Sequence, residues 1–216
     1  MSQLTLKERA YQEVRRLIIT GEIKPGDFLS ERSLVERLEM SRTPIRSALD
    51  RLEIEGFIRQ APKQGVVVQE ISINRAFDIY ELRIAIESHV VNKLSQQSIQ
   101  DDEEKRIEEI LKQQKALIDN EIYNNASFLA FLSLDFEFHN ELIKIVDNKE
   151  FIQIMDQIQD KLLLIASNVF RKQENRMLVS YEDHLRIFEH IKSGQHTEAV
   201  EEMVKHLEYG KQILMA

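Results

Sequence analysis

Residues 128–146, FLAFLSLDFEFHNELIKIV, form the most apolar run of the chain. Apolar side chains fall on nearly all faces of a helix built from this run, a pattern typical of a central, buried helix. Asp135 and His139 are four residues apart, so they lie on one face of that helix, one turn above the other. A buried carboxylate is costly unless it is paired or bound to a metal. The run therefore predicts a buried helix whose polar pair needs partners.

The rest of the chain after residue 70 is almost free of helix breakers and predicts five more helices around this one. The six expected ranges are 74–95, 101–120, 127–146, 150–170, 177–193 and 197–214. Asn148 and Gly194 are expected at helix ends, and Thr197 is expected to cap the last helix. The short loops between these ranges are typical of an all-α antiparallel bundle.

Two of the later helices each carry a histidine within an apolar stripe, His184 in one and His206 in the other. Together with Asp135 and His139, they could bring one carboxylate and three imidazoles into the bundle interior. This donor set suits a divalent transition metal, with zinc as the first choice and nickel, manganese or iron as alternatives. Each histidine alone is more often an ordinary core or surface residue, and periodicity does not prove that the helices face one another.

The N-terminal part of the chain contains short elements separated by turns. A helix over residues 6–20 is followed by a shorter helix capped by Ser30 and by a third helix that ends at Gly56. Thr43 as N-cap with Pro44 at the first helical position marks the start of the third helix, which is expected to bury Ile54. Residues 57–59 and 66–68 then predict a β-hairpin around the turn at 62–65. Three helices and a hairpin are typical of a winged helix-turn-helix, whose third helix enters the major groove of DNA.

Composition and charge fit a chain of two parts with different partners. Residues 1–70 hold 12 lysines and arginines against 11 aspartates and glutamates, whereas the remainder holds 17 against 26. The chain has no cysteine, which excludes disulfides and thiolate metal sites. No apolar run is long enough to span a bilayer, and the N-terminus lacks the apolar core of a signal peptide. These features predict a cytoplasmic protein that does not bind membranes.

The segments SERSLVERL at 30–38 and SRTPIRSALDRLEIEGFI at 41–58 resemble the DNA-binding domain of GntR-superfamily bacterial regulators. The resemblance implies that residues 1–70 form a winged helix-turn-helix that binds a double-stranded operator. Arginine at the start of the third helix also suits guanine and phosphate recognition. The contacts that the resemblance implies are Arg32, Ser41, Arg42, Thr43, Arg46, Gln64 and Gly65. The alternative is a set of arginines on a solvated helix face.

The pattern Asp135-x-x-x-His139, Asn148, Glu182-Asp-His184 and Met203-x-x-His206-Leu is similar to the FCD ligand-binding domain of the FadR-like GntR subfamily. The resemblance assigns residues 71–216 to a metal-binding, effector-binding and dimerisation domain. It implies that Asp135, His139, His184 and His206 hold a metal at the floor of a pocket, where a small carboxylate completes the coordination. Some FadR-like members lack these ligands and bind acyl-CoA, so the four filled positions argue against that branch.

Arg83 lies at the edge of the inward-facing stripe of the helix at 74–95, and the resemblance places an arginine at the effector pocket there. The alternative is a surface pair of Arg83 with Glu87, four residues later. Ser167 and Asn168 are further candidates for effector contacts.

These features together predict a mainly α protein that acts as a transcriptional regulator, as a repressor rather than an activator, and not as an enzyme. A single recognition helix per chain requires a homodimer to read a pseudo-palindromic operator. Operator affinity would depend on a small carboxylate held at the metal. Two alternatives are a regulator that senses the ion itself and a metal-dependent hydrolase. Against the hydrolase, the only extra acid near the motif is Glu137, which lies on another face of its helix.

Overall fold

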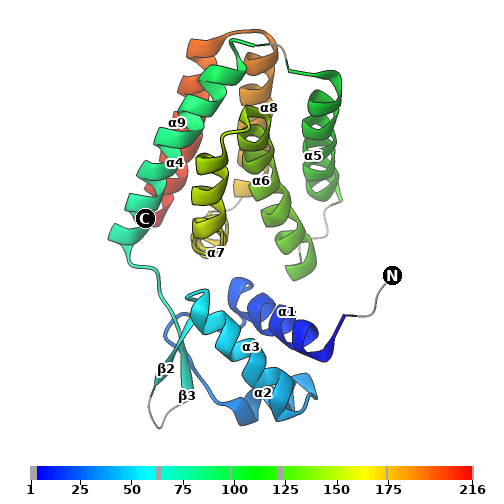
Figure 1. The fold of residues 1–216 in the computed structure, drawn as a ribbon, viewed down its shortest axis with the longest axis vertical. Coiled ribbons are helices and arrows are strands. Elements are labelled where there is room, and N and C mark those ends of the chain that lie inside the picture. Colours follow the sequence, from blue (N-terminus) through cyan, green and yellow to red (C-terminus); the bar gives the residue numbers. More distant parts are fainter. Residues whose placement is uncertain (1–3, 62–64, 98, 121–123, 174, 216) are drawn as a thin grey trace. The chain divides into compact units, whose positions relative to one another are not determined.

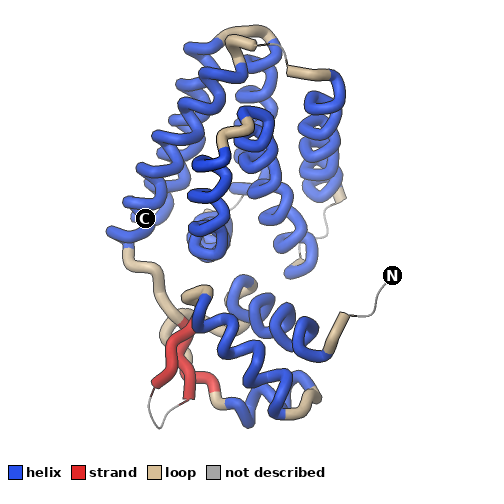
Figure 2. The backbone as a smooth tube through the Cα atoms, viewed as in Figure 1, coloured by secondary structure: helices blue, strands red, loops and turns tan. Residues whose placement is uncertain are grey.

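The chain consists of two compact units, Met1–Ile71 and Ser72–Ala216. The structure is a computed structural model that describes residues 4–61, 65–97, 99–120, 124–173 and 175–215. The N-terminal unit combines helices with a small sheet, and the C-terminal unit is helical (Figures 1 and 2). Within those ranges, no helix has the length and apolar character needed to cross a membrane.

The N-terminal unit is a winged helix-turn-helix, as the sequence predicts. Its elements are α1 (Leu6–Ile19), β1 (Phe28–Leu29), α2 (Glu31–Leu38), α3 (Arg42–Ile54), β2 (Ile58–Ala61) and β3 (Gly65–Val68). The strands form an antiparallel sheet in the order β1-β3-β2, with Ile58 opposite Val68 and Phe28 opposite Val67. Helices α1 and α3 pack together, and Leu17, Leu52 and Phe57 are fully buried in this unit.

Three details of this unit differ from the prediction. Strand β1 was not expected, because two residues are too short to show an alternating pattern. Helix α3 begins at Arg42 with Ser41 as N-cap, so Thr43 lies inside the first turn and is not the cap. Pro44 is accepted there because the first-turn N–H groups have no partner within the helix. Ile54 was expected in the core but is 87% exposed at the end of α3.

The C-terminal unit is a helical bundle in which the predicted and observed helix ends differ by at most two residues. Within the described residues its helices are α4 (Ile73–Leu94), α5 (Asp101–Asp119), α6 (Asn125–Val146), α7 (Lys149–Lys172), α8 (Arg176–Lys192) and α9 (His196–Met215). Helix α6 packs against α4, α5, α7 and α8, and its buried residues include Phe131, Phe138 and Leu142. The mainly α fold is therefore confirmed, and α6 is a buried helix enclosed by four others.

Side-chain caps explain where several of these helices begin. Oδ1 of Asn148 accepts hydrogen bonds from the backbone N–H groups of Glu150 and Phe151, which starts α7 as predicted. The prediction that Thr197 caps α9 is wrong. Helix α9 begins one residue earlier, and the N–H of Ala199 donates to the carbonyl of Gln195.

Candidate functional site

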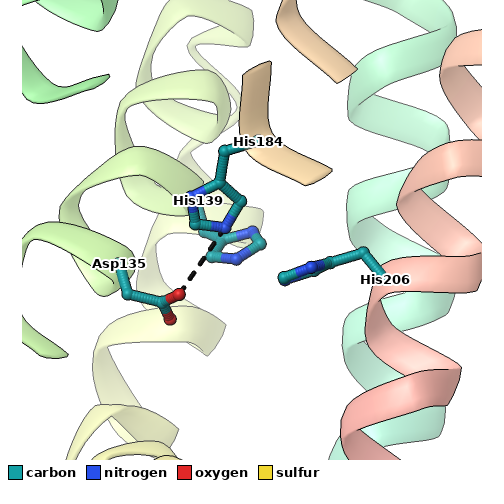
Figure 3. Close-up of side chains that lie close together, drawn as sticks. All are labelled: Asp135, His139, His184 and His206. Carbon is teal, nitrogen blue, oxygen red and sulfur yellow. Dashed lines mark ion pairs between the residues drawn. The ribbon is translucent and has the colours of Figure 1, made fainter. Parts of the chain in front are cut away.

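Four polar side chains point toward one another inside the C-terminal unit (Figure 3). Helix α6 supplies Asp135 and His139, α8 supplies His184 and α9 supplies His206. One potential ligand atom of each residue lies within 4.8 Å of those of the others, and all four residues are buried. The Nε2 atom of His184 lies 3.6 Å from Oδ1 of Asp135. The structure thus brings together all four residues that the sequence singled out, in one cluster that we call the Asp-His cluster.

Each histidine of the cluster directs its Nδ1 atom toward an acceptor on another helix. The distances are 2.6 Å from His139 to Oε2 of Glu87, 3.1 Å from His184 to Oε1 of Gln114, and 3.0 Å from His206 to Oδ2 of Asp183. Carboxylate and amide oxygens only accept hydrogen bonds, so Nδ1 of His184 and Nδ1 of His206 carry the proton. This tautomer leaves Nε2 of His184 and of His206 available to a metal, and such outer partners fix the ring orientation.

Burial keeps two of these imidazoles neutral. It holds the pKa of His184 well below its usual value, where the neighbouring His206 and His139 add to the effect. Burial also lowers the pKa of His206 to about 4, despite the opposing hydrogen bond with Asp183. A neutral imidazole is the form that binds a metal, so the cluster does not have to lose protons from these rings near neutral pH.

The donor set fits a divalent metal ion. Neither ring nitrogen of His139 has a hydrogen-bond partner of acceptable geometry among the described residues, although Nδ1 is close to Glu87. Buried polar atoms without a partner are uncommon in native proteins. Three imidazoles and one carboxylate match the preference of zinc and similar ions.

Asp135 has a further partner that fixes its position. The hydroxyl group of Ser180, on α8, donates a hydrogen bond of 2.6 Å to Oδ1 of Asp135. Ser180 is fully buried. Because that hydroxyl engages only Oδ1, this contact leaves Oδ2 of the carboxylate for another interaction.

Arg83 and Glu87 of α4 form a buried pair and not the surface pair considered from the sequence. Nε of Arg83 donates to Oε1 of Glu87 at 2.6 Å, and the residues are 8% and 1% exposed. Burial disfavours the carboxylate, yet Arg83 and His139 outweigh it and lower the pKa of Glu87 to about 2. Glu87 therefore joins the guanidinium group to the cluster.

A small cavity of about 20 Å³ borders the cluster. Its lining includes Arg83, Asp135, His206 and Arg176, so the structure places Arg83 beside the cluster. The other two effector candidates are not at this cavity. The hydroxyl of Ser167 donates to the carbonyl of Leu164 in its own helix, and Asn168 is exposed. Both lie on α7, where successive side chains point about 100° apart around the helix axis. The α7 residues that line the cavity are Ala166, Val169 and Phe170, and the sequence alone did not show which face of α7 meets it.

The predicted DNA contacts in the N-terminal unit are exposed at the starts of α2 and α3. The exposed residues are Arg32, Ser41, Arg42, Thr43 and Arg46. Gln64 lies outside the described residues, as does the adjacent Lys63. Gly65 is exposed and has φ of 99°, and a Cβ atom there would lie 2.4 Å from the carbonyl oxygen of Leu29. The wing thus requires glycine at this position for a structural reason.

Two of these arginines are paired within the unit. Nε and Nη2 of Arg46 lie 3.0 and 3.1 Å from the two carboxylate oxygens of Glu31, and Arg32 pairs with Glu36 at 2.8 Å. A guanidinium group held in this forked way presents the geometry that it would offer to a guanine base or a phosphate. Binding DNA through Arg46 would exchange Glu31 for a nucleic-acid acceptor.

Four outer partners of the cluster were not predicted from the sequence: Glu87, Gln114, Ser180 and Asp183. Asp183 precedes His184 directly, and Glu87 follows the inward-facing Ile86, so both had a local signal. Gln114 lies on α5 among charged residues and gives no such signal.

Comparison with known proteins agrees with the two units. Residues 6–68 match the family described as bacterial regulatory proteins, gntR family, and residues 78–209 match the FCD domain. The Nta operon transcriptional regulator of Aminobacter aminovorans is 27% identical over 192 residues, which cover 89% of this chain and 86% of that protein. The gluconate operon transcriptional repressor of Bacillus subtilis (strain 168) is 28% identical over 189 residues, covering 88% and 74% of the two chains.

Among solved structures, E. coli McbR/YncC is similar in fold, with a TM-score of 0.72 and 18% identity over 99% of this chain and 98% of that one. The matched families and the named relatives are transcriptional regulators. These findings confirm the prediction that the chain is not an enzyme, and the hydrolase alternative is dropped.

Proposed function

Because the chain belongs to the gntR family of bacterial regulatory proteins and carries an FCD domain, it is a DNA-binding transcriptional regulator, and we propose that a small carboxylate bound at a metal ion in its C-terminal unit sets its affinity for an operator. The observation that carries this proposal is the buried Asp-His cluster beside a cavity that an arginine lines. The cluster supplies the ion site, and the cavity supplies the place for the ligand.

The proposed ion is zinc or another divalent transition metal held by Asp135, His139, His184 and His206. Four protein ligands leave further coordination positions on ions that accept five or six donors, and a bound ion would offer these positions to carboxylate oxygens. Neutral histidines with fixed Nδ1 partners support the assignment, because each presents Nε2 without deprotonation.

Arg83 is the proposed partner of the effector carboxylate. Its guanidinium group lines the cavity, and a planar fork binds a carboxylate through two parallel hydrogen bonds. In the present arrangement Glu87 occupies that fork from within the same helix. An effector would therefore compete with Glu87 or share Arg83 with it, which couples the ligand to the outer partner of His139.

For the N-terminal unit we propose operator contacts from Arg32, Ser41, Arg42, Thr43, Arg46, Gln64 and Gly65. A homodimer on a pseudo-palindromic operator follows from the single recognition helix per chain, and the C-terminal unit is the proposed site of dimerisation. Similarity to a protein named as a gluconate operon repressor supports repression as the mode of action. The effector acts only if its affinity differs between the operator-bound and the free protein.

The test is operator binding by fluorescence anisotropy, with the operator obtained by selection from random DNA. Chelator-treated protein, zinc-loaded protein, and zinc-loaded protein with a panel of hydroxy and dicarboxylic acids are compared at one salt concentration. We expect one acid to change operator affinity by roughly 5-fold to 150-fold, the usual range of coupling between two sites, and only in the zinc-loaded protein. An equal effect of the acid on chelator-treated protein would contradict the proposal.

The same experiment separates the second candidate, a regulator for which the ion itself is the effector. In that case zinc alone would change operator affinity by the full amount, and no acid would add to it. The fit of the donor set to an ion favours both candidates, whereas the arginine at the cavity favours the carboxylate.

A further inference from the structure

Arg176, the first residue of α8, is a buried cation without an adequate partner among the described residues. It is 3% exposed, and its Nε and Nη1 atoms are buried with no hydrogen bond. The nearest carboxylate oxygen is Oδ2 of Asp183, 3.9 Å from Nη1, which is beyond hydrogen-bonding distance. Asp183 already accepts from His206 and Arg186. A buried charge left in this state is costly and calls for an explanation.

The guanidinium group of Arg176 is held by aromatic rings and lies at the cavity. Its Cζ atom lies 5.2 Å from the ring centroid of Phe170 and 5.3 Å from that of Tyr209. These contacts position the group but satisfy none of its N–H donors. The same residue lines the cavity together with Arg83, Asp135 and His206. Two arginines therefore reach one small cavity at the edge of the Asp-His cluster.

The charges around the cluster indicate how many negative charges a ligand should carry. Among the described residues, three carboxylates and three guanidinium groups contact the cluster, its partners or the cavity. They are Asp135, Glu87 and Asp183 against Arg83, Arg176 and Arg186. Glu202 and Lys205 add one charge of each sign further out. A divalent ion would then bring two uncompensated positive charges into a buried site, which a ligand with two negative charges would neutralise.

We propose that Arg176 binds the second carboxylate of the effector and makes the site selective for small dicarboxylic acids over monocarboxylic acids. This inference rests on the proposed function, in which the first carboxylate binds the ion. Arg83 and Arg176 then have different partners: Arg83 retains Glu87 within reach, whereas Arg176 depends on the ligand. Because the cavity of about 20 Å³ holds no more than about one water molecule, the side chains that line it must move apart to admit the acid.

The test compares two acids that differ only at the second carboxylate. Malate and 2-hydroxybutyrate share an α-hydroxycarboxylate group, and a methyl group in the second replaces the distal carboxylate of the first. Their affinities for zinc-loaded full-length protein are measured by titration calorimetry, with zinc content checked before and after. We expect malate to bind at least about tenfold more tightly, as a charge-assisted hydrogen bond would give.

The residue assignment is tested with Arg176→Gln and Arg176→Lys. In Arg176→Gln the preference for malate should disappear, while the affinity for 2-hydroxybutyrate and the zinc content stay unchanged. In Arg176→Lys, which keeps the charge, part of the preference should return. Arg106→Gln is the matched control, because Arg106 pairs with Asp102 and Glu141 and does not line the cavity. This control should retain the full preference.

The outcomes separate this inference from the function on which it rests. Equal binding of the two acids by the wild-type protein would overturn the role of Arg176 and leave the metal-bound carboxylate intact. A preference that survives in Arg176→Gln would also overturn it. If neither acid binds the zinc-loaded protein, the carboxylate site itself fails, and the inference fails with it. The wild-type comparison gives this answer even if the variants do not fold.

Discussion

Glu87→Gln tests whether the outer partners of the Asp-His cluster control the metal site. Glu87 is 1% exposed, and its two oxygens lie 2.6 Å from Nε of Arg83 and 2.6 Å from Nδ1 of His139. The substitution keeps the shape of the side chain but removes its charge. It therefore leaves Arg83 as an uncompensated buried cation and removes the negative charge beside Nδ1 of His139.

Two separate effects follow, each with its own size. Breaking a buried ion pair from one side typically costs about 3–5 kcal/mol, so the metal-free protein should lose stability of this order. Loss of an outer partner lowers metal affinity by roughly 10-fold to 100-fold, because the ligand ring is less well oriented and less basic. Stability is measured by urea unfolding of chelator-treated protein, and affinity by zinc titration against a competing chelator.

Glu141→Gln is the matched control for this experiment. Glu141 also lies on a bundle helix, is 8% exposed and pairs with an arginine, with 2.5 Å between its Oε1 and Nε of Arg106. Within the described part of the chain, its polar partners are Arg106 and Lys144 and not the cluster histidines, so its substitution should leave zinc affinity unchanged. If Glu87→Gln binds zinc as tightly as the control does, the outer-partner reasoning is refuted.

Three further predictions concern DNA recognition, pH and packing. Arg46→Ala should weaken specific operator binding by ~1–3 kcal/mol, the worth of a forked base contact. Because the side chain of Arg46 is 66% exposed, the melting temperature of the variant should equal that of the wild type. Equal losses of affinity for operator and for random DNA in an anisotropy assay would show that Arg46 contacts only phosphate. The metal-free protein should lose stability as the pH falls from about 6.5 towards 4. The reason is that His184 and His206 bind protons more readily in the unfolded chain than in the folded one, where their pKa values are lowered. The shift of His206 alone corresponds to a loss of about 3 kcal/mol in the free energy of unfolding. Urea midpoints that stay flat over this interval would contradict neutral buried imidazoles. Gly210→Ala should destabilise the protein by about 1–3 kcal/mol in urea unfolding, because the new Cβ would lie 2.6 Å from the buried hydroxyl of Tyr80. This clash opposes the gain in helix propensity that alanine normally brings. A variant more stable than the wild type would contradict this packing.

Periodic patterns in the sequence predicted most of the helical architecture. Residues 128–146 are apolar on nearly all faces, and α6 is indeed buried among four other helices of its unit. Helix ends were less certain where several residues could serve as a cap. Ser41 caps α3 without a side-chain hydrogen bond, so Thr43 and Pro44 gave the stronger but misleading signal. Ile54 shows the limit of periodicity at a helix end, where the last turn can leave the core.

The cluster was predictable in part because two of its residues are four positions apart on one helix. That His184 and His206 would face this pair depended on resemblance, since spacing within a helix says nothing about a neighbouring helix. The outer partners depend on contacts between residues far apart in sequence, such as Gln114 with His184. The same holds for Arg176, whose missing partner becomes visible only when its burial is known.

The metal content of the purified protein decides whether the Asp-His cluster is a metal site. Native mass spectrometry of the wild-type chain and of a His184→Ala/His206→Ala double variant weighs the bound ion and any retained ligand together. The account predicts one divalent ion per wild-type chain and none in the double variant, since half of the donor set is lost. An ion bound to the same extent in both proteins would contradict it.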